Sequence, residues 1–285
     1  MLLGVLLSLL TSVAWACGNV MVSRSGRAIG TVRATLWALL VGSLLAGLLS
    51  LHFDHPREPL TLTVLLWTVV ASAAGLTAYL CLFYTFSHGE LSLTAPIVSS
   101  WSLVASALSM VVFGERLGPV PLVGAGLVFA GVVLVAVSSS RGRAKSGQGA
   151  MGLMVALGAA LGFGVMIPAL THVTPAFGEL RATAVVYLAE VALGLPLALL
   201  RGERVAPPGR AAWPLVLATA GSETLGFVAV SFARRFAPLT VVTPVSSLAS
   251  ALTVLYAWVV LRERPRPLAA AGAALASTGI VILSR

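Results

Sequence analysis

The sequence predicts an all-α integral membrane protein in which ten transmembrane helices form two inverted five-helix repeats. Of its 285 residues, 58% are hydrophobic and only 9% are charged, whereas water-facing proteins carry roughly 25% charged residues. Shifting the chain by 148 residues aligns it with itself without a gap, which identifies an internal repeat. Each copy contains five long apolar runs. Because five is odd, the second copy must cross the membrane in the opposite direction to the first.

Matches between uncommon residues support the repeat as strongly as matches between alanines or leucines. The matched positions include Arg33-Ala34-Thr35 with Arg181-Ala182-Thr183, Pro96 with Pro244, Ser99 with Ser247, and Glu115-Arg116 with Glu263-Arg264. We therefore divide the chain into a first repeat, 1–138, a basic linker, 139–148, and a second repeat, 149–285.

The apolar runs define the elements, and each is near the ~20 residues that an α-helix needs to cross a bilayer. Backbone groups in hydrocarbon must bond within their own segment, so each run is predicted to be one helix. The first run is expected to be a helix rather than a cleaved signal, because the second copy repeats it. The ten runs are 2–22, 33–51, 62–86, 91–113, 119–138, 151–171, 180–200, 212–233, 239–261 and 267–283.

Basic residues indicate the orientation, because equivalent loops of the two copies differ in their arginine content. The first loop carries Arg24, Arg27 and Arg33, whereas its counterpart carries only Arg181. Placing the basic loops in the cytoplasm puts 12 of the 18 basic residues inside and both termini outside. The formal charge of +9 is thus expected to meet anionic lipid headgroups of the cytoplasmic (inner) membrane, not nucleic acid.

Aromatic residues lie within the first and fourth runs. Trp15 and Trp101 are each predicted either to line a cavity or to pack at an interface between helices.

Two acids lie in the middle of the seventh and eighth runs, where an ionised carboxylate is costly and usually faces a cavity or a partner. They are Glu190 and Glu223, and the first copy has Gly42 and Gly75 at the equivalent positions. We interpret one or both acids as a site for a proton, a cation or an amino group. The alternative is a structural hydrogen bond or ion pair between packed helices.

The eighth run carries a small and polar stripe that includes Ser222 and Glu223, at the spacing of one helix face. That face is either a cavity wall or a close helix contact. Tyr79 and Phe227 occupy matched positions near this stripe. Each is predicted either to stack on an aromatic or cationic ligand or to pack between helices.

Serines follow helical spacing in the fourth and ninth runs, after the matched prolines. They include Ser99, Ser102, Ser247 and Ser250. Their hydroxyls could bind a polar substrate, while the alternative is that they bond back to their own helix and let neighbouring helices approach.

The fifth and tenth runs are rich in glycine and alanine and have no ionisable residue between their ends. They are predicted to be scaffold or a contact between protomers, so we expect a monomer or a homodimer through these helices. The two cysteines have no metal-type spacing, and no phosphate-binding loop or catalytic triad stands out. We expect no catalytic residues, no metal and no cofactor.

The five-helix copies, each with Glu-Arg before a Gly/Ala-rich helix, resemble the drug/metabolite transporter superfamily in its EamA-type branch. The motifs are Gly114-Glu115-Arg116-Leu117 and Arg262-Glu263-Arg264-Pro265, with Trp15-Ala16 and Phe163-Gly164 where that family tends to have Trp-Gly. The resemblance covers nearly the whole chain. It implies a central cavity lined by the first, third and fourth helices and their counterparts, which places Phe163 in the cavity wall.

The resemblance also implies alternating-access transport of a small metabolite, often an amino acid or a toxic compound, usually exported in exchange for protons. We therefore expect an amino acid-like or cationic substrate, with protons and membrane lipids as further partners. The role of the acids comes from their own position and not from the resemblance: Glu223, with Glu190, would exchange a proton for the solute. The alternatives are a proton-independent facilitator and, from a different class, a lipid flippase or a membrane scaffold.

Overall fold

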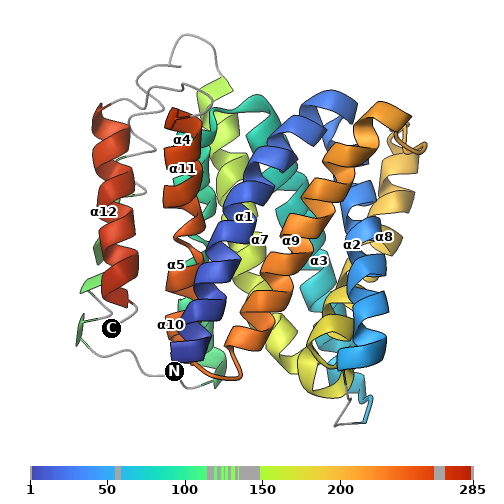
Figure 1. Ribbon diagram of the computed structural model, residues 1–285, viewed down its shortest axis with the longest axis horizontal. Coiled ribbons are helices and arrows are strands. Elements are labelled where there is room, and N and C mark those ends of the chain that lie inside the picture. Colours follow the sequence, from blue (N-terminus) through green and yellow to red (C-terminus); the bar gives the residue numbers. More distant parts are fainter. Residues whose placement is uncertain are drawn as a thin grey trace.

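The computed structural model is a bundle of helices that run roughly along one direction (Figure 1). It describes residues 2–54, 59–113, 148–259 and 267–283, together with scattered positions between 119 and 134. The predicted fifth run, 119–138, and the linker, 139–148, lie largely outside these residues. Throughout the described part the regular structure is helical, which confirms the all-α prediction.

The described helices follow the repeat. The first repeat contains α1 (Leu2–Ile29), α2 (Thr31–Phe53), α3 (Leu62–His88), α4 (Leu91–Val98) and α5 (Trp101–Phe113). The second contains α7 (Gln148–Phe177), α8 (Glu179–Leu200), a 3-10 turn η1 (Arg210–Ala212), α9 (Trp213–Ala233), α10 (Leu239–Ser246), α11 (Ala249–Val259) and α12 (Pro267–Leu283). Seven described helical segments are long and apolar enough to cross a membrane. The count of ten stays a prediction.

The first and sixth helices are longer than the apolar runs predict. α1 extends to Ile29 and α7 to Phe177, and the chain then turns at Gly30 and Gly178, whose φ angles are 87° and 86°. Glycine adopts this left-handed conformation without the steric penalty of a side chain, so it ends the helix at the matched position of each copy. The prediction ended too early because helices continue beyond their apolar stretch into the polar boundary.

The fourth and ninth runs are each broken into two short helices, which corrects the prediction of one continuous helix per run. The break follows α4 at Ser99 and follows α10 at Ser247. In both copies the serine three residues later bonds back to the break: Ser102 Oγ donates to the Ser99 carbonyl at 3.2 Å, and Ser250 Oγ donates to the Ser247 carbonyl at 3.1 Å. Such bonds offer the backbone an alternative to the helical ladder.

Matched helices run in opposite directions: α1 begins at the end of the bundle where α7 finishes, and α2 and α8 are likewise opposed (Figure 1). The packing is also paired, because α3 packs along α7, its counterpart α9 packs along α1, and α2 packs along α8. The main hydrophobic core consequently lies between the two repeats and draws side chains from both.

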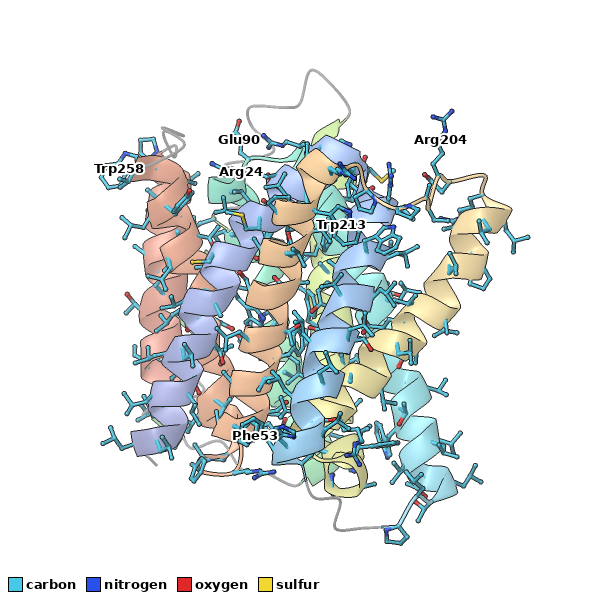
Figure 2. The ribbon with its side chains drawn as sticks, turned by 45° about the vertical axis from the view of Figure 1, so that its right-hand side comes forward. Arg24, Phe53, Glu90, Arg204, Trp213 and Trp258 are labelled. Atoms are coloured by element: carbon cyan, nitrogen blue, oxygen red, sulfur yellow. The ribbon has the colours of Figure 1, made fainter. Side chains whose placement is uncertain are left out.

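The two ends of the bundle carry different groups. Arg24, Glu90 and Arg204 lie at one end and Phe53 at the other (Figure 2). Asp54 directly follows Phe53 at the end of α2. We refer to these ends as the Arg24 face and the Asp54 face.

Candidate functional site

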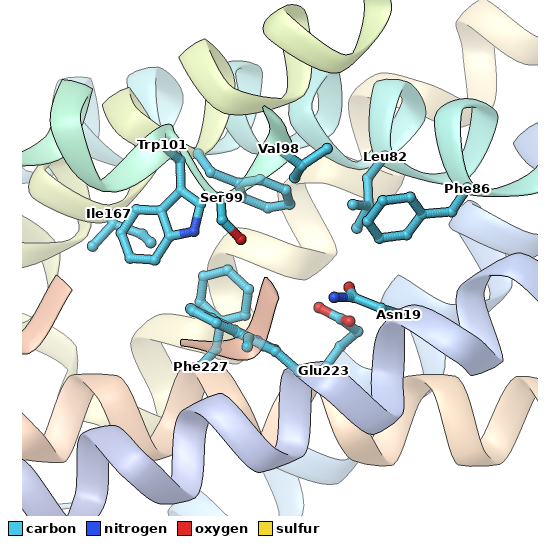
Figure 3. A pocket seen from close by; sticks show the side chains of 12 residues that line it. Asn19, Leu82, Phe86, Val98, Ser99, Trp101, Ile167, Glu223 and Phe227 are labelled. Atoms are coloured by element: carbon cyan, nitrogen blue, oxygen red, sulfur yellow. The ribbon is translucent and has the colours of Figure 1, made fainter. Parts of the chain in front are cut away.

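A cavity lies at the interface between the repeats. Its empty volume is about 420 Å³, counting the part that opens outward. Among its twelve lining residues there is one acid and no base (Figure 3). They are Trp15, Asn19, Leu82, Phe86, Val98, Ser99, Trp101, Phe163, Ile167, Glu223, Phe227 and Ala249.

Glu223, midway along α9, is the charged group of this cavity. The residue is 5% exposed, and its Oε2 accepts a long hydrogen bond from the Tyr79 hydroxyl at 3.4 Å. Its Oε1 has no hydrogen-bond partner among the described residues. Gly18 on α1 makes room for the carboxylate, because a Cβ there would lie 2.6 Å from Oε1. The half-bonded, buried carboxylate is therefore available to a proton or to a cationic group.

Asn19 lies beside Glu223 on the same side of the cavity (Figure 3). Its Nδ2 donates a hydrogen bond of 2.9 Å to Thr253 Oγ1, which ties α1 to α11. The cavity thus has a polar corner formed by an acid and an amide, next to the Ser99 side chain at the break between α4 and α5.

Aromatic rings form the remaining walls, and two of their contacts are related by the repeat. Trp15 packs edge-on against Phe227 with centroids 5.1 Å apart, and their counterparts Phe163 and Tyr79 pack edge-on at the same distance. Trp101 adds an edge contact to Trp15 at 5.7 Å. These rings present π faces and edges that suit an apolar or cationic ligand.

The lining departs from symmetry where the two copies differ in side-chain size. Trp101 on α5 corresponds to Ala249 on α11, and Asn19 on α1 corresponds to Ile167 on α7; all four line the cavity. One wall is therefore bulky and apolar where the other is small. The polar corner belongs to one side only.

Glu190 does not line this cavity. Its side chain on α8 is fully buried, and neither carboxylate oxygen has a hydrogen-bond partner in the part of the chain that the structure describes. It packs directly against Gly75 of α3, where a Cβ would overlap Oε1 and would lie 3.0 Å from the Met166 sulfur. An ionised Glu190 carboxylate would have neither a cation nor a hydrogen-bond donor beside it within the described residues. The geometry therefore favours a neutral, protonated carboxyl group.

The structure brings together six of the residues that the sequence singles out and leaves the others outside the cavity lining. Tyr79 lies behind the wall, bonded to Glu223. Ser222 is half-buried beside Gly18. Ser102, Ser247 and Ser250 all donate to carbonyls of their own chain segment. The six lining residues are Trp15, Ser99, Trp101, Phe163, Glu223 and Phe227.

Six of the lining residues, and Tyr187 behind them, were not singled out from the sequence. Asn19 was detectable, because it is the chain's single asparagine and lies inside an apolar run. Tyr187, which bonds to Tyr79, had a similar signal as a hydroxyl one turn before Glu190. Leu82 and Phe86 gave no signal, since apolar side chains on an apolar helix are indistinguishable from packing.

Polar contacts join the helix ends at the Asp54 face. The Arg235 guanidinium forms a bidentate ion pair with Glu179, and these hydrogen bonds raise the pKa of Arg235, which stays cationic. Arg234 donates to Thr174 Oγ1 at 3.3 Å. The Asp54 carboxylate at the end of α2 accepts from the Arg181 backbone N–H at 2.5 Å, in the first turn of α8.

The cavity extends the other way, toward the Arg24 face. Its lining includes Leu82 and Phe86, which lie in the last two turns of α3 before that helix ends at His88. The site is thus asymmetric along the membrane normal as well as across the repeat interface.

The fold and the cavity define a multi-pass helical membrane protein built from two repeats around an acid-containing cavity. The chain belongs to the EamA-like transporter family, whose model matches residues 2–137 and again 150–285, and so to the drug/metabolite transporter superfamily. A solved crystal structure of a protein is similar over 99% of this chain and 96% of its own, with a TM-score of 0.74 at 18% identity. That likeness supports the fold. A comparison with curated proteins finds no match.

Proposed function

We propose that this protein is a secondary transporter that moves a small amino-bearing or cationic solute across the cytoplasmic membrane by alternating access. The observation that carries the proposal is Glu223, a buried acid that has one unbonded oxygen and no base beside it among the described residues that line the cavity. An anionic solute would meet uncompensated repulsion there, whereas an ammonium group would gain a charge-assisted hydrogen bond. The aromatic walls would hold the apolar part of the solute.

The duplicated fold supplies a mechanism for alternating access. If the two repeats are inverted in the membrane, rocking of one repeat against the other exchanges the open and closed ends of the cavity. In this conformation the cavity extends toward the Arg24 face, while the Arg235–Glu179 pair joins α8 to the end of α9 at the Asp54 face. Breaking this pair would be part of opening that face. The positive-inside rule places the basic Arg24 face in the cytoplasm, with the termini outside.

Proton coupling follows from the position of Glu223. The carboxylate can hold a proton or an ammonium group, but a solute cation gains little from a protonated acid. Solute would therefore bind from the cytoplasm after proton release and leave outside when a proton replaces it. The direction of the proton gradient makes this an efflux reaction.

The test is transport by purified protein in proteoliposomes, with a panel of amino-bearing, cationic and anionic solutes at two pH gradients. Glu223→Gln should abolish pH-driven transport of the solute that the wild type accepts. Glu90→Gln is the matched control, because Glu90 is an exposed acid at a helix start and should leave transport unchanged. Undiminished pH-driven transport by Glu223→Gln would exclude the proposed role of this acid.

The same assay tests one alternative, and the structure bears on the other. A proton-independent facilitator would carry solute equally at both gradients. A flippase would need a polar path open to lipid, but the groove between α11 and α12 is lined mainly by apolar and small side chains, among them Val254, Leu255 and Trp258. This groove lies on the helix predicted to contact a second protomer, and the homodimer stays a prediction.

A further inference from the structure

Two tyrosine hydroxyls connect Glu223 to the inner carboxyl group of Glu190. Tyr79 on α3 donates to Glu223 Oε2 at 3.4 Å, and its oxygen lies 2.8 Å from the Tyr187 hydroxyl on α8. Both rings are about 1% exposed, so this chain of hydroxyls is shielded from solvent and lipid. Tyr187 and Glu190 are three residues apart on α8, which places them on neighbouring positions of one helix face.

Within the described residues, Glu190 has no structural partner that would explain an acid at this position. Both of its oxygens lack a hydrogen-bond partner there, and the residue is fully buried against Gly75. A simple packing role would favour an apolar side chain of the same size, since an unpaired buried carboxyl group is costly. The acid is therefore best explained by a proton that it receives and releases.

We propose that Glu223, Tyr79, Tyr187 and Glu190 form a proton relay that carries the coupling proton from the substrate cavity into the interface between the repeats. This inference rests on the proposed proton-coupled transport and names the path that its proton takes. The relay crosses from α9 through α3 to α8, so it joins the two repeats that move against each other.

The proton balance is simple. With the Tyr79 hydroxyl turned from Glu223 toward Tyr187, protonated Glu223 gives its proton to the Tyr79 oxygen as Tyr79 passes its own hydroxyl proton to Tyr187. Tyr187 in turn passes its hydroxyl proton to Glu190, which has first released the proton that it holds in this conformation. Glu223 ends ionised, Glu190 ends protonated, and both tyrosines are neutral before and after. Rotation of the two hydroxyls then resets the path.

The last link is open in this conformation, because Glu190 accepts no hydrogen bond from Tyr187. Closing it requires Glu190 to swing away from Gly75 toward Tyr187, a movement that a shift of α3 against α8 would permit. The relay would then conduct in one conformation of the transporter and be interrupted in the other.

The electrostatic surroundings suit a neutral relay. The titratable groups that face it are Tyr79 from α3, Tyr187 and Glu190 from α8, and Glu223 from α9. α7 contributes the Met166 sulfur beside Gly75, α1 contributes Trp15 and Asn19 on the cavity side, and α2 contributes Gly42 against the Tyr187 ring. Within the described residues no cation faces either carboxylate. A proton is therefore the positive charge that this path can accommodate.

The decisive variant is Tyr187→Phe, which removes one hydroxyl while keeping the ring that packs against Phe227 at 5.8 Å. Because Tyr187 does not line the cavity, solute binding and solute-for-solute exchange should stay within about twofold of wild type. Solute-coupled proton flux, followed with a pH dye inside proteoliposomes, should fall by at least about tenfold, and the pH dependence of uptake should flatten. Glu190→Gln should likewise keep solute exchange near the wild-type rate and lower the proton flux.

Tyr84→Phe is the matched control, because Tyr84 lies on the same helix as Tyr79 but is 40% exposed and stacks on His88. It should leave proton flux unchanged. Normal proton flux in Tyr187→Phe together with a loss in Glu223→Gln would overturn the relay and leave the transport proposal intact. Normal flux in both variants would overturn the transport proposal itself. Loss of exchange along with flux in Tyr187→Phe would show a structural role and would also overturn the relay.

Discussion

Gly75→Ala offers a quantitative test of the packing that holds Glu190. A Cβ at this position would overlap Glu190 Oε1 and would lie 2.9 Å from its Cδ and 3.0 Å from the Met166 sulfur. Forcing a methyl group into such a contact costs about 1–3 kcal/mol. Alanine regains about 1 kcal/mol over glycine in a helix interior. The substitution alone should therefore lower the free energy of unfolding by about 0–2 kcal/mol.

The informative quantity is the coupling between Gly75→Ala and Glu190→Ala. Truncating Glu190 removes the two nearest atoms that the new methyl group meets and opens space into which the flexible Met166 sulfur can shift. In that background Gly75→Ala should therefore stabilise the protein by about 1 kcal/mol. The two backgrounds should differ by about 1–3 kcal/mol, which is well above the scatter of independent sites. The assay is reversible unfolding of the four proteins of this cycle in mixed micelles.

Gly221→Ala is the control, because Gly221 lies inside α9 and an added Cβ would have no described atom within 4 Å beyond its chain neighbours and its own helix backbone. It should be neutral or slightly stabilising in both backgrounds. If Gly75→Ala changed stability by the same amount with and without the Glu190 side chain, the close packing of this pair would be refuted.

Three further predictions address the cavity and the Asp54 face. Ala249→Leu should fill the small wall and weaken solute binding by at least about tenfold at an unchanged unfolding midpoint, and retained affinity would show that the solute binds elsewhere. Arg235→Gln should break the pair with Glu179, cost about 1 kcal/mol and speed hydrogen exchange in the first turn of α8; unchanged exchange would mean that the pair does not hold this face shut. Asn19→Ala should lose the bond to Thr253 and about 1 kcal/mol of stability, and an unaltered unfolding midpoint would count against that bond.

The sequence predicts the helical class well because the bilayer imposes a simple rule. Any segment that crosses hydrocarbon must satisfy its own backbone, so long apolar runs become helices, and the 148-residue repeat pairs them. The same rule fails for the fourth and ninth runs. Their apolar composition continues through Ser99 and Ser247, but the helix breaks there because serine hydroxyls and i to i+3 bonds replace the regular ladder.

The site is predictable only in part, because a helical stripe specifies a face but not what that face meets. Glu190 and Glu223 carry the same signal, an acid in an apolar run. One lines the cavity, and the other packs against Gly75. The difference depends on which helix of the other repeat lies opposite, which is long-range packing that no local pattern records. Leu82 lines the cavity for the same reason and has no sequence signal.

At the interface, a residue difference between the two copies in one place depends on a difference in another. Glycines of the first copy receive polar side chains of the second: Gly18 receives Glu223, Gly75 receives Glu190, and Gly42 lies against the Tyr187 ring. A glutamate at both members of a matched pair would have no space and would place a second acid in an interface that already lacks a cation. Loss of side chain in one copy and gain of a polar group in the other therefore depend on each other. Two identical repeats would lack either the acids or the space that holds them. The asymmetry is therefore a packing requirement of a buried acidic site.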